Sequence, residues 1–322
     1  MYKKFTPAFG LKNKHLQTLY STFFKPSLNL DFEIERFEFE DTDFTQCYWY
    51  KTKNSNKNTP VVMLFHGLAG SYKSPYIQGT MKKLSDVGFD CVLIHFRGCD
   101  IPNNLPRSYH SADTQDAKEI LNSLQKRYSD NKFYAVGYSI GGNMLLNLLA
   151  QLKDASPFEK AISVSAPMQL DICANSMNKG FSRFYQYILL KDLKKALEEK
   201  FDRFDMQSLI GIKKSQIKDI KDFWEFDNIY TAPIHGFKTA QNYYKVCSAK
   251  QYLKDIQTQT LIIHSRDDPF MSEEILPNAD EISPCIELEI YDYGGHVGFI
   301  SNSIFRANYW LEERIVNYFS IK

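Results

Sequence analysis

The chain has 322 residues, of which 43% are hydrophobic and 24% are charged, so it can bury a substantial core and is not a disordered protein. Its 39 basic and 38 acidic residues almost cancel, which argues against nucleic acid as the main partner. The length fits either two average domains or one large α/β unit.

The six cysteines lie far apart and form no C-x-x-C pair, and no two histidines have metal-ligand spacing. We therefore expect neither a structural zinc nor a disulfide framework, and a reducing compartment fits this usage better. The first residues lack the apolar stretch of a secretory signal. No apolar run approaches the ~20 residues of a membrane helix, so the sequence predicts a cytoplasmic protein without a membrane span.

Two segments near the beginning have the pattern of antiparallel strands. Phe32 to Phe39 alternates apolar and charged residues, and Phe44 to Lys51 is rich in aromatic and polar residues. Such alternation is typical of strands with one face in water. The polar stretch Asn54 to Asn58 then predicts a loop.

After this loop, short and wholly apolar segments alternate with helical ones. This pattern predicts a mostly parallel sheet with helices on both faces, the α/β class. The predicted strands are Val61–Phe65, Asp90–His95, Phe133–Val136, Ala161–Ser165, Thr260–His264 and Ile286–Tyr291. The predicted helices are Pro75–Val87, Asp113–Tyr128, Ile140–Leu152 and Ile304–Phe319.

One interval, about residues 169–258, contains no convincing strand but includes a lysine-rich amphipathic run from Phe181 to Phe204. A compact domain rarely holds a structureless loop of that length, so we expect a helical insertion within a single domain of residues 1–322. The insertion is either an extra packing layer or a cap, because helices inserted at this point would lie above the strand ends where ligands bind.

The most informative motif is Gly137-Tyr138-Ser139-Ile140-Gly141, which joins a predicted strand to a predicted helix. A strand that enters a helix through G-x-S-x-G is the pattern of a nucleophile elbow. Glycine permits the sharp turn, and the turn exposes the serine hydroxyl above the sheet. Ser139 is therefore the candidate nucleophile.

A serine nucleophile needs a base within hydrogen-bond reach. In this fold the base comes after the serine in the chain, which leaves His235, His264 and His296. His235 precedes any candidate acid, and His264 closes an apolar strand. His296 lies in the glycine-rich Gly294–Gly298 loop between the last strand and the last helix, so we predict that it is the base.

The base in turn needs an orienting carboxylate, which this fold presents after the preceding strand. Asp267 and Asp268 are adjacent there, and only one of them can reach the imidazole. We favour Asp268, because Pro269 fixes the turn directly after it. In the alternative, Asp268 is a turn residue and Asp267 is the orienting group.

Two backbone N–H groups must also face the oxyanion of a tetrahedral intermediate. We assign one to Ile140, directly after the serine. The second is assigned to Leu68 in His66-Gly67-Leu68-Ala69-Gly70, the loop after the first parallel strand.

Other polar motifs fit the scaffold better. Arg97 comes after the second parallel strand and is expected to anchor loops rather than bind a ligand. The stretch from Tyr109 to Asp113 has the pattern of a helix start, with Ser111 or Asp113 as the cap. Aromatic residues in the insertion are expected to pack, although they could line an acyl pocket.

Together these motifs resemble the YheT-like subfamily of α/β-hydrolases, the esterases related to AB-hydrolase-domain lipases of plants and animals. The resemblance runs along the chain and departs from the pattern at Lys14, where the family has proline, and after Ser111, where Ala-Asp replaces Gly-Glu. The matching blocks are Asn13–Thr18, His66–Ser71, Phe96–Cys99, Tyr109–Ser111, Gly137–Asn143, Ser165–Pro167, Phe226–Asp227, Gly236–Phe237, Asp267–Phe270 and Gly294–Phe299.

By that resemblance, Ser139, Asp268 and His296 occupy the positions of the family's charge-relay triad. We expect a serine hydrolase that cleaves carboxylic esters, with short-chain esters or monoacylglycerols suggested by the family alone. No metal or organic cofactor is expected. Thioesterase or amidase activity with the same triad remains open, as does a catalytically idle binding protein, and the oligomeric state is not predicted.

Overall fold

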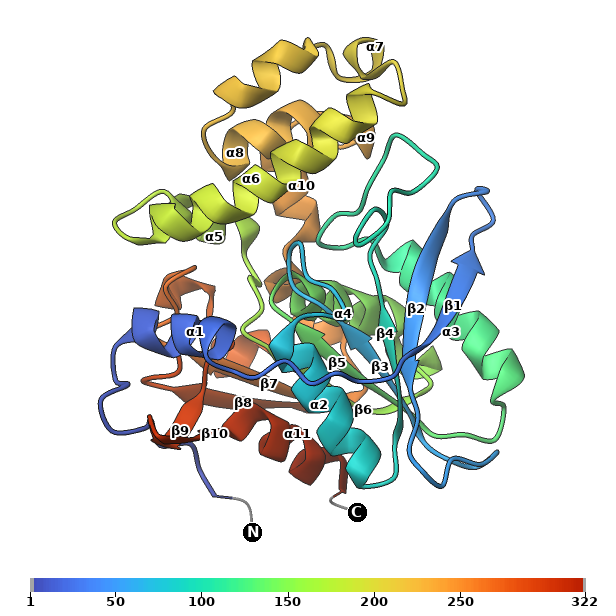
Figure 1. Ribbon diagram of the computed structural model, residues 1–322, viewed down its shortest axis with the longest axis vertical. Helices are drawn as coiled ribbons and strands as arrows, with labels where there is room; N and C mark the ends of the chain where they lie inside the picture. Colours follow the sequence, from blue (N-terminus) through green and yellow to red (C-terminus); the bar gives the residue numbers. More distant parts are fainter. Residues whose placement is uncertain (1–2, 321–322) are drawn as a thin grey trace.

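The computed structural model describes residues 3–320, and within them an eight-stranded sheet forms the centre of the molecule (Figure 1). The strand order is β1-β2-β4-β3-β5-β6-β7-β8. β1 pairs with β2, and β2 with β4, in antiparallel fashion. The remaining strands, β4, β3, β5, β6, β7 and β8, are parallel to one another, as the sequence predicted. The strands are β1 (Glu33–Glu38), β2 (Phe44–Tyr50), β3 (Val61–Phe65), β4 (Asp90–Ile94), β5 (Phe133–Tyr138), β6 (Phe158–Val164), β7 (Gln259–Ser265) and β8 (Ile286–Tyr291).

Helices cover both faces of this sheet, and β3 shows why. All five of its side chains are buried. Val61, Met63 and Phe65 pack into one core, whereas Val62 and Leu64 pack into another. A strand buried on both faces must be apolar at every position, which explains the uninterrupted apolar run. The helices are α2 (Pro75–Asp86) and α11 (Trp310–Ser320) on one face, and α3 (Thr114–Arg127) and α4 (Ile140–Leu152) on the other.

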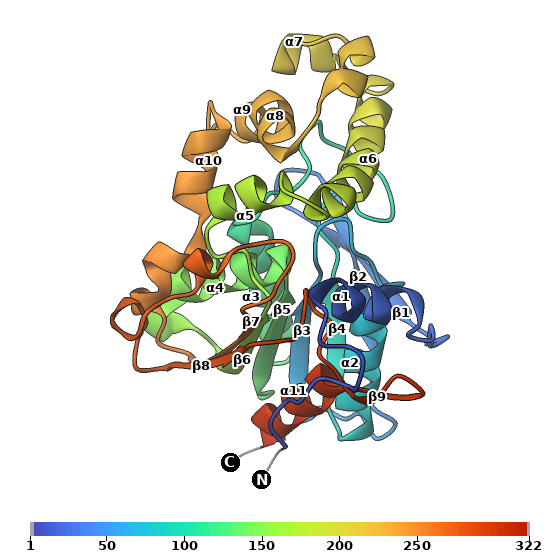
Figure 2. The ribbon, with the colours of Figure 1, turned by 90° about the vertical axis from the view of Figure 1, so that its left-hand side faces the viewer.

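The interval between β6 and β7 is helical and has two small cores of its own. Figures 1 and 2 show these helices together beyond one end of the sheet. We call this segment the insertion. Its helices are α5 (Leu170–Met177), α6 (Ser182–Phe201), α7 (Met206–Ile210), α8 (Phe223–Phe226), α9 (Ala232–Ile234) and α10 (Ala240–Cys247), with a π-helical turn at Asp227–Thr231 and short 3₁₀ turns.

Two elements differ from the sequence prediction. The helix expected from Ile304 begins at Trp310, because residues 300–309 form a hairpin of β9 (Ile300–Ser303) and β10 (Arg306–Tyr309). The left-handed backbone of Asn302 and a bond from the Arg306 N–H to the Ser303 hydroxyl shape this hairpin. The second difference is α1 (Lys14–Phe23), a helix that we did not predict. Its N-cap is Asn13, whose side chain accepts bonds from two backbone N–H groups.

Candidate active site

Ser139 lies at the sharp turn between β5 and α4. Its backbone has φ 51° and ψ −123°, a strained conformation for a residue with a side chain. The Ser139 N–H donates to the Val164 carbonyl of the neighbouring strand at 2.9 Å, which holds the turn against the sheet. A strained backbone that surrounding bonds hold in place is typical of a functional position.

The flanking glycines permit this turn. A Cβ added to Gly137 would lie 2.4 Å from the Gly141 carbonyl oxygen, and one added to Gly141 would lie 2.4 Å from the His66 carbonyl oxygen. Backbone atoms cannot yield at these distances, so any larger residue would displace α4 from the strand ends. The glycines of the motif are thus explained by close backbone contact.

His296 bridges Ser139 and Asp268. Its Nε2 lies 2.9 Å from Ser139 Oγ, and its Nδ1 lies 2.8 Å from Asp268 Oδ2. A carboxylate can only accept, so the Nδ1–H donates to Asp268 and the free Nε2 accepts from the serine hydroxyl. The Phe270 ring stacks on the imidazole with centroids 3.9 Å apart and planes 12° apart. The three predicted residues are therefore in one continuous hydrogen-bond chain.

The neighbouring Asp267 has a different partner. Its Oδ1 accepts from the Gly295 N–H at 2.9 Å, while its Oδ2 is buried without a hydrogen-bond partner in the described chain. Burial raises the pKa of this carboxyl group. Of the two adjacent aspartates, Asp268 touches the imidazole and Asp267 holds the loop that carries it.

The loop of His296 is also held by α1, which the sequence analysis did not connect with the site. The His296 N–H donates to Thr18 Oγ1 at 2.9 Å. The Gln17 side chain donates to the Leu11 and Ile300 carbonyls and accepts from the Ile300 N–H. Gln17 and Thr18 belong to the Asn13–Thr18 block, which matches the family pattern. That match was the one sequence signal that this segment contributes to the site.

The loop after β3 faces the serine from the other side. A Cβ at Gly67 would lie 3.3 Å from the Ser139 Cβ, so glycine lets this loop approach the nucleophile. The N–H groups of Gly67, Ala69 and Gly70 donate to Tyr76 Oη, Tyr109 Oη and the Gly67 carbonyl. The Leu68 amide lies outside these bonds, and Leu68 lines the cavity in front of Ser139.

His66 holds this loop to the neighbouring strand end. Its Nδ1–H donates to the Gly67 carbonyl at 2.7 Å, and its Nε2 accepts from the Phe96 N–H at 3.2 Å. Burial lowers the pKa of His66 to about 3, with a smaller contribution from His95. A permanently neutral imidazole can keep both bonds, because one nitrogen donates and the other accepts.

Ile140 occupies the position required of the other oxyanion donor. It is the first residue of α4, and the first N–H groups of a helix have no intrahelical acceptor. Ile140 lines the same cavity as Leu68 and Ser139. The two residues that are predicted to supply the amide donors therefore line the same cavity as the nucleophile.

That space is a cavity of about 360 Å³ between the sheet end and the insertion. The insertion contributes apolar and aromatic side chains from several helices, and the sheet end contributes Ser139, Leu68 and Ile140. Such a lining suits an apolar ligand portion held above a polar reacting group. Insertion residues that line the cavity include Ala174, Leu189, Leu193, Leu197, Phe226 and Tyr230.

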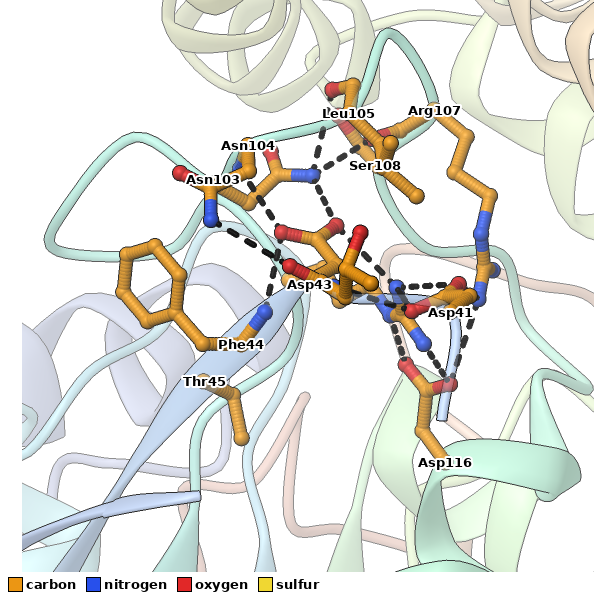
Figure 3. Close-up of polar contacts among 12 residues, drawn as sticks. Asp41, Asp43, Phe44, Thr45, Asn103, Asn104, Leu105, Arg107, Ser108 and Asp116 are labelled. Carbon is orange, nitrogen blue, oxygen red and sulfur yellow. Dashed lines mark hydrogen bonds and ion pairs between the residues drawn. The ribbon is translucent and has the colours of Figure 1, made fainter. Parts of the chain in front are cut away.

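A buried ionic network supports the loops beside the cavity (Figure 3). The Arg97 guanidinium is 1% exposed and bonds to Asp41, Asp43 and Asp116. Arg107 joins Asp41 and Asp116 from the other side. Arg97 thus anchors loops, as predicted, although part of it also lines the cavity.

The insertion enters this network through Lys200. Its ammonium group donates to Asn103 Oδ1 at 2.8 Å and to the Leu105 and Arg107 carbonyls at 2.9 and 3.2 Å. Burial lowers the pKa of Lys200 to about 8. Lys200 is therefore a polar connection between α6 and the loop of residues 103–107.

One other group has ligand-type side chains close together. Donor atoms of His110, Asp113 and His235 lie within 4.8 Å of one another. The Asp113 carboxylate pairs with Arg107 at 3.1 Å, and His110 Nδ1 accepts from the Ala112 N–H. The group therefore joins the insertion to the loop before α3. Asp113 occupies the N-cap position of α3, as the sequence predicted, although its side chain makes no capping bond.

Comparison with known proteins agrees with this architecture. The family model described as the alpha/beta hydrolase fold matches residues 60–303. The esterase Pf2001 of Pyrococcus furiosus, a solved structure, superimposes with a TM-score of 0.54 at 14% identity, covering 90% of this chain and 92% of that one. The chain belongs to the α/β-hydrolase fold family.

Within that family the similarity is specific. The chain is 39% identical over 313 residues to “Putative esterase YheT” of Escherichia coli (strain K12), covering 97% of this chain and 92% of that protein. It is 29% identical over 277 residues to the monoacylglycerol lipase of Saccharomyces cerevisiae, covering 83% of this chain and 60% of that protein. The chain is thus a member of the YheT-like subfamily. Between residues 3 and 320, none of the helices is both long and apolar enough to cross a membrane.

Proposed function

We propose that this protein is a serine hydrolase that cleaves carboxylic esters through an acyl-enzyme on Ser139. The observation that carries the proposal is the hydrogen-bond chain from Asp268 through His296 to Ser139. The names of the similar proteins, an esterase and a monoacylglycerol lipase, support an ester substrate.

In the proposed mechanism, Ser139 Oγ attacks the acyl carbonyl carbon while its proton passes to His296 Nε2. Asp268 orients the imidazole and stabilises the imidazolium that forms. The bond from the carbonyl carbon to the alcohol oxygen then breaks, and His296 returns the proton to the departing alcohol. Water, deprotonated by His296, attacks the acyl-enzyme and releases the carboxylic acid and free Ser139.

The amides of Leu68 and Ile140 are the proposed donors to the oxyanion. Both residues line the cavity beside the nucleophile. The strained backbone of Ser139 supports this assignment, because it fixes the hydroxyl relative to the start of α4. These donors act on the tetrahedral intermediate, where negative charge develops on the carbonyl oxygen.

We further propose that residues 169–258 act as a cap within a single domain and bind the apolar part of the substrate. Aromatic and aliphatic side chains of the insertion line the cavity, which favours an acyl chain as the occupant. Acylglycerols and short-chain esters are the proposed substrate classes. The wide spacing of the six cysteines supports a reducing, cytoplasmic location.

Labelling with a fluorophosphonate probe tests the nucleophile directly. We expect covalent labelling of the wild type and none of Ser139→Ala, with unchanged circular dichroism for both proteins. The variant should lose on the order of 10⁶-fold in kcat on p-nitrophenyl esters. A folded wild type that neither reacts with the probe nor hydrolyses any ester would refute the proposal and favour an idle, ligand-binding protein.

The same triad can cleave thioesters and amides, so the acyl donor requires a second measurement. Matched ester, thioester and anilide substrates with the same acyl chain compare the three leaving groups. We expect the ester to give the highest kcat/KM. A higher value for the thioester would reassign the protein as a thioesterase without altering the role of Ser139.

A further inference from the structure

Ten large apolar side chains are exposed in three short segments of the chain. These segments are residues 3–30, which contain α1; residues 178–191, which contain the first half of α6; and residues 299–309, which contain the β9–β10 hairpin. Phe9 and Phe305 are each 91% exposed. The other eight are Leu16, Phe23, Phe24, Phe181, Phe184, Tyr187, Ile188 and Ile304. Contiguous exposed apolar groups of this number mark an interaction surface rather than ordinary surface composition.

Direct contacts join the three segments into one surface. The Tyr20 hydroxyl of α1 donates to the Ile304 carbonyl of the hairpin at 2.7 Å, and Phe9 forms a β-bridge with Ser303. His15 of α1 also contacts the segment of residues 178–191, because the centroids of the His15 and Phe181 rings are 4.7 Å apart. In Figure 2, α6, α1 and the hairpin succeed one another along the right-hand side of the molecule.

The charge of this surface is one-sided. The three segments contain nine lysine or arginine residues and no aspartate or glutamate, although the whole chain carries 38 acids and a net charge of only +1. Lys25 is buried against Glu312. The other eight are exposed and form no ion pair within residues 3–320: Lys3, Lys4, Lys12, Lys14, Lys179, Arg183, Lys191 and Arg306.

We propose that these three segments form a docking surface for an anionic lipid bilayer, which we call the docking face. The free energy falls when exposed aromatic side chains enter the interface between headgroups and acyl chains. Each nearby lysine or arginine adds attraction to anionic lipids, and acidic residues would oppose it. The docking face offers both attractions and lacks the opposing charge, which matches a bilayer better than a neutral or basic protein partner.

The docking face and the cavity share α6. Phe184, Tyr187 and Ile188 are on the exposed side of this helix, whereas Leu189 and Leu193 line the cavity. A bilayer on the docking face would therefore lie against the helix that roofs the site. Access of lipid esters to Ser139 by this route rests on the proposed function, but docking itself does not.

Vesicle flotation with the full-length Ser139→Ala protein tests docking without hydrolysis of the lipid. We expect binding to vesicles of phosphatidylcholine with a quarter phosphatidylglycerol, weaker binding to pure phosphatidylcholine, and loss of binding in 0.5 M NaCl. In this background, Phe9→Ser, Phe23→Ser and Phe305→Ser together should weaken binding at least about tenfold. Lys12→Glu, Arg183→Glu and Arg306→Glu together should do the same.

A matched control replaces three exposed apolar residues away from the docking face: Val87→Ser, Leu209→Ser and Val246→Ser. This control should bind vesicles like its parent. With Ser139 present, all three combined variants should hydrolyse dissolved p-nitrophenyl acetate like the wild type. Absence of vesicle binding by the parent, or equal binding by all variants, would overturn docking. If the parent protein self-associates and only the docking-face variants lose this self-association, the occupant is a second copy of the chain. That result would also overturn docking on a bilayer.

Discussion

The sheet end and the insertion meet at the same cavity, but they are built differently. At the sheet end, the reacting groups are fixed by short hydrogen bonds from several elements, and glycines allow backbone contacts that larger residues would block. The insertion consists of short helices around two small cores, with several exposed aromatic side chains. Many hydrogen bonds join it to the rest of the molecule, including those of Lys200, the bond from the Ser182 hydroxyl to the Pro269 carbonyl and the bond from the Asn143 side chain to the Cys247 carbonyl.

Under the proposed function, this difference implies separate tasks for the two regions. A reaction needs atoms held at fixed distances, and the sheet end supplies them. Substrate choice needs a cavity whose shape can differ between relatives, and side chains of the insertion supply much of its lining. Mutations at the sheet end should therefore change rate or stability, whereas mutations in the insertion should change preference among substrates.

The largest expected effect separates the two adjacent aspartates at the sheet end. Asp268→Asn removes the acceptor that selects the imidazole tautomer, so kcat should fall by about 10⁴-fold. Asp267→Asn keeps an oxygen for the Gly295 N–H and should cost less than about tenfold. Steady-state kinetics on one soluble ester measure both variants. A larger loss in Asp267→Asn would reverse the assignment of the acid.

The next effect concerns the ionic network below the loops. Arg97→Met leaves the fully buried Asp43 without its ion-pair partner and leaves Asp41 and Asp116 with Arg107 alone, so it should lower the free energy of unfolding by about 3–5 kcal/mol. The matched control is Arg36→Met, because the Arg36 side chain is 49% exposed and its one ion pair within residues 3–320 is with the exposed Glu38. That control should cost at most about 1 kcal/mol. Urea unfolding at pH 7 measures both, and equal losses would show that the network does not support the sheet end.

A smaller effect should appear in the insertion. Ala174 lines the cavity and is 4% exposed, so Ala174→Leu adds three carbon atoms to its interior. Long-chain p-nitrophenyl esters should lose roughly 10–200-fold in kcat/KM, while the acetate should be little affected. The ratio of the two substrates is the readout. Equal losses for both chain lengths would mean that Ala174 does not contact the acyl chain.

The last expected effect is at the joint between the two regions, where it is small at pH 7 and grows in acid. Burial lowers the pKa of His110 to about 4 and that of His235 to about 2, with Arg107 and His110 as secondary causes. Both values lie below the unfolded value of about 6.5, so below pH 6.5 the unfolded chain binds more protons at these groups. Stability is therefore lost as pH falls from about 6.5 towards 4.

Replacing both histidines by glutamine should make this loss shallower by about 1.4 kcal/mol per pH unit for each group. Urea unfolding at several pH values between 7 and 5 measures the slope, and the wild type provides the reference because all other titrating groups are shared. An unchanged slope would show that the two histidines charge equally in the folded and unfolded chain.

The sequence predicted the parallel strands well because each carries a local apolar pattern. Val61–Phe65 and Ile286–Tyr291 have the predicted bounds, and β6 begins three residues before the predicted start. Motifs at the ends of such strands could be interpreted because the fold gives the loop after each strand a defined place at the edge of the sheet. For that reason Ser139, Asp268 and His296 could be selected before their distances were known.

The supporting contacts could not be predicted in the same way. Thr18 and His296 are 278 positions apart, and no local pattern relates them. The stacking of Phe270 on His296 depends on side-chain orientation rather than periodicity. The predicted helix Ile304–Phe319 wrongly includes β10, because the four-residue strands of the β9–β10 hairpin are too short to show an alternating pattern clearly.

The bond between Thr18 and His296 also bears on how the protein is made. Synthesis completes α1 well before the loop that contains His296, because Thr18 and His296 are 278 positions apart. Ser139 is therefore translated well before its base, and a nascent chain cannot hydrolyse esters by the proposed mechanism. By the same mechanism, activity requires α1 to meet this loop, so deletion of residues 3–19 should silence the enzyme while every triad residue is still present.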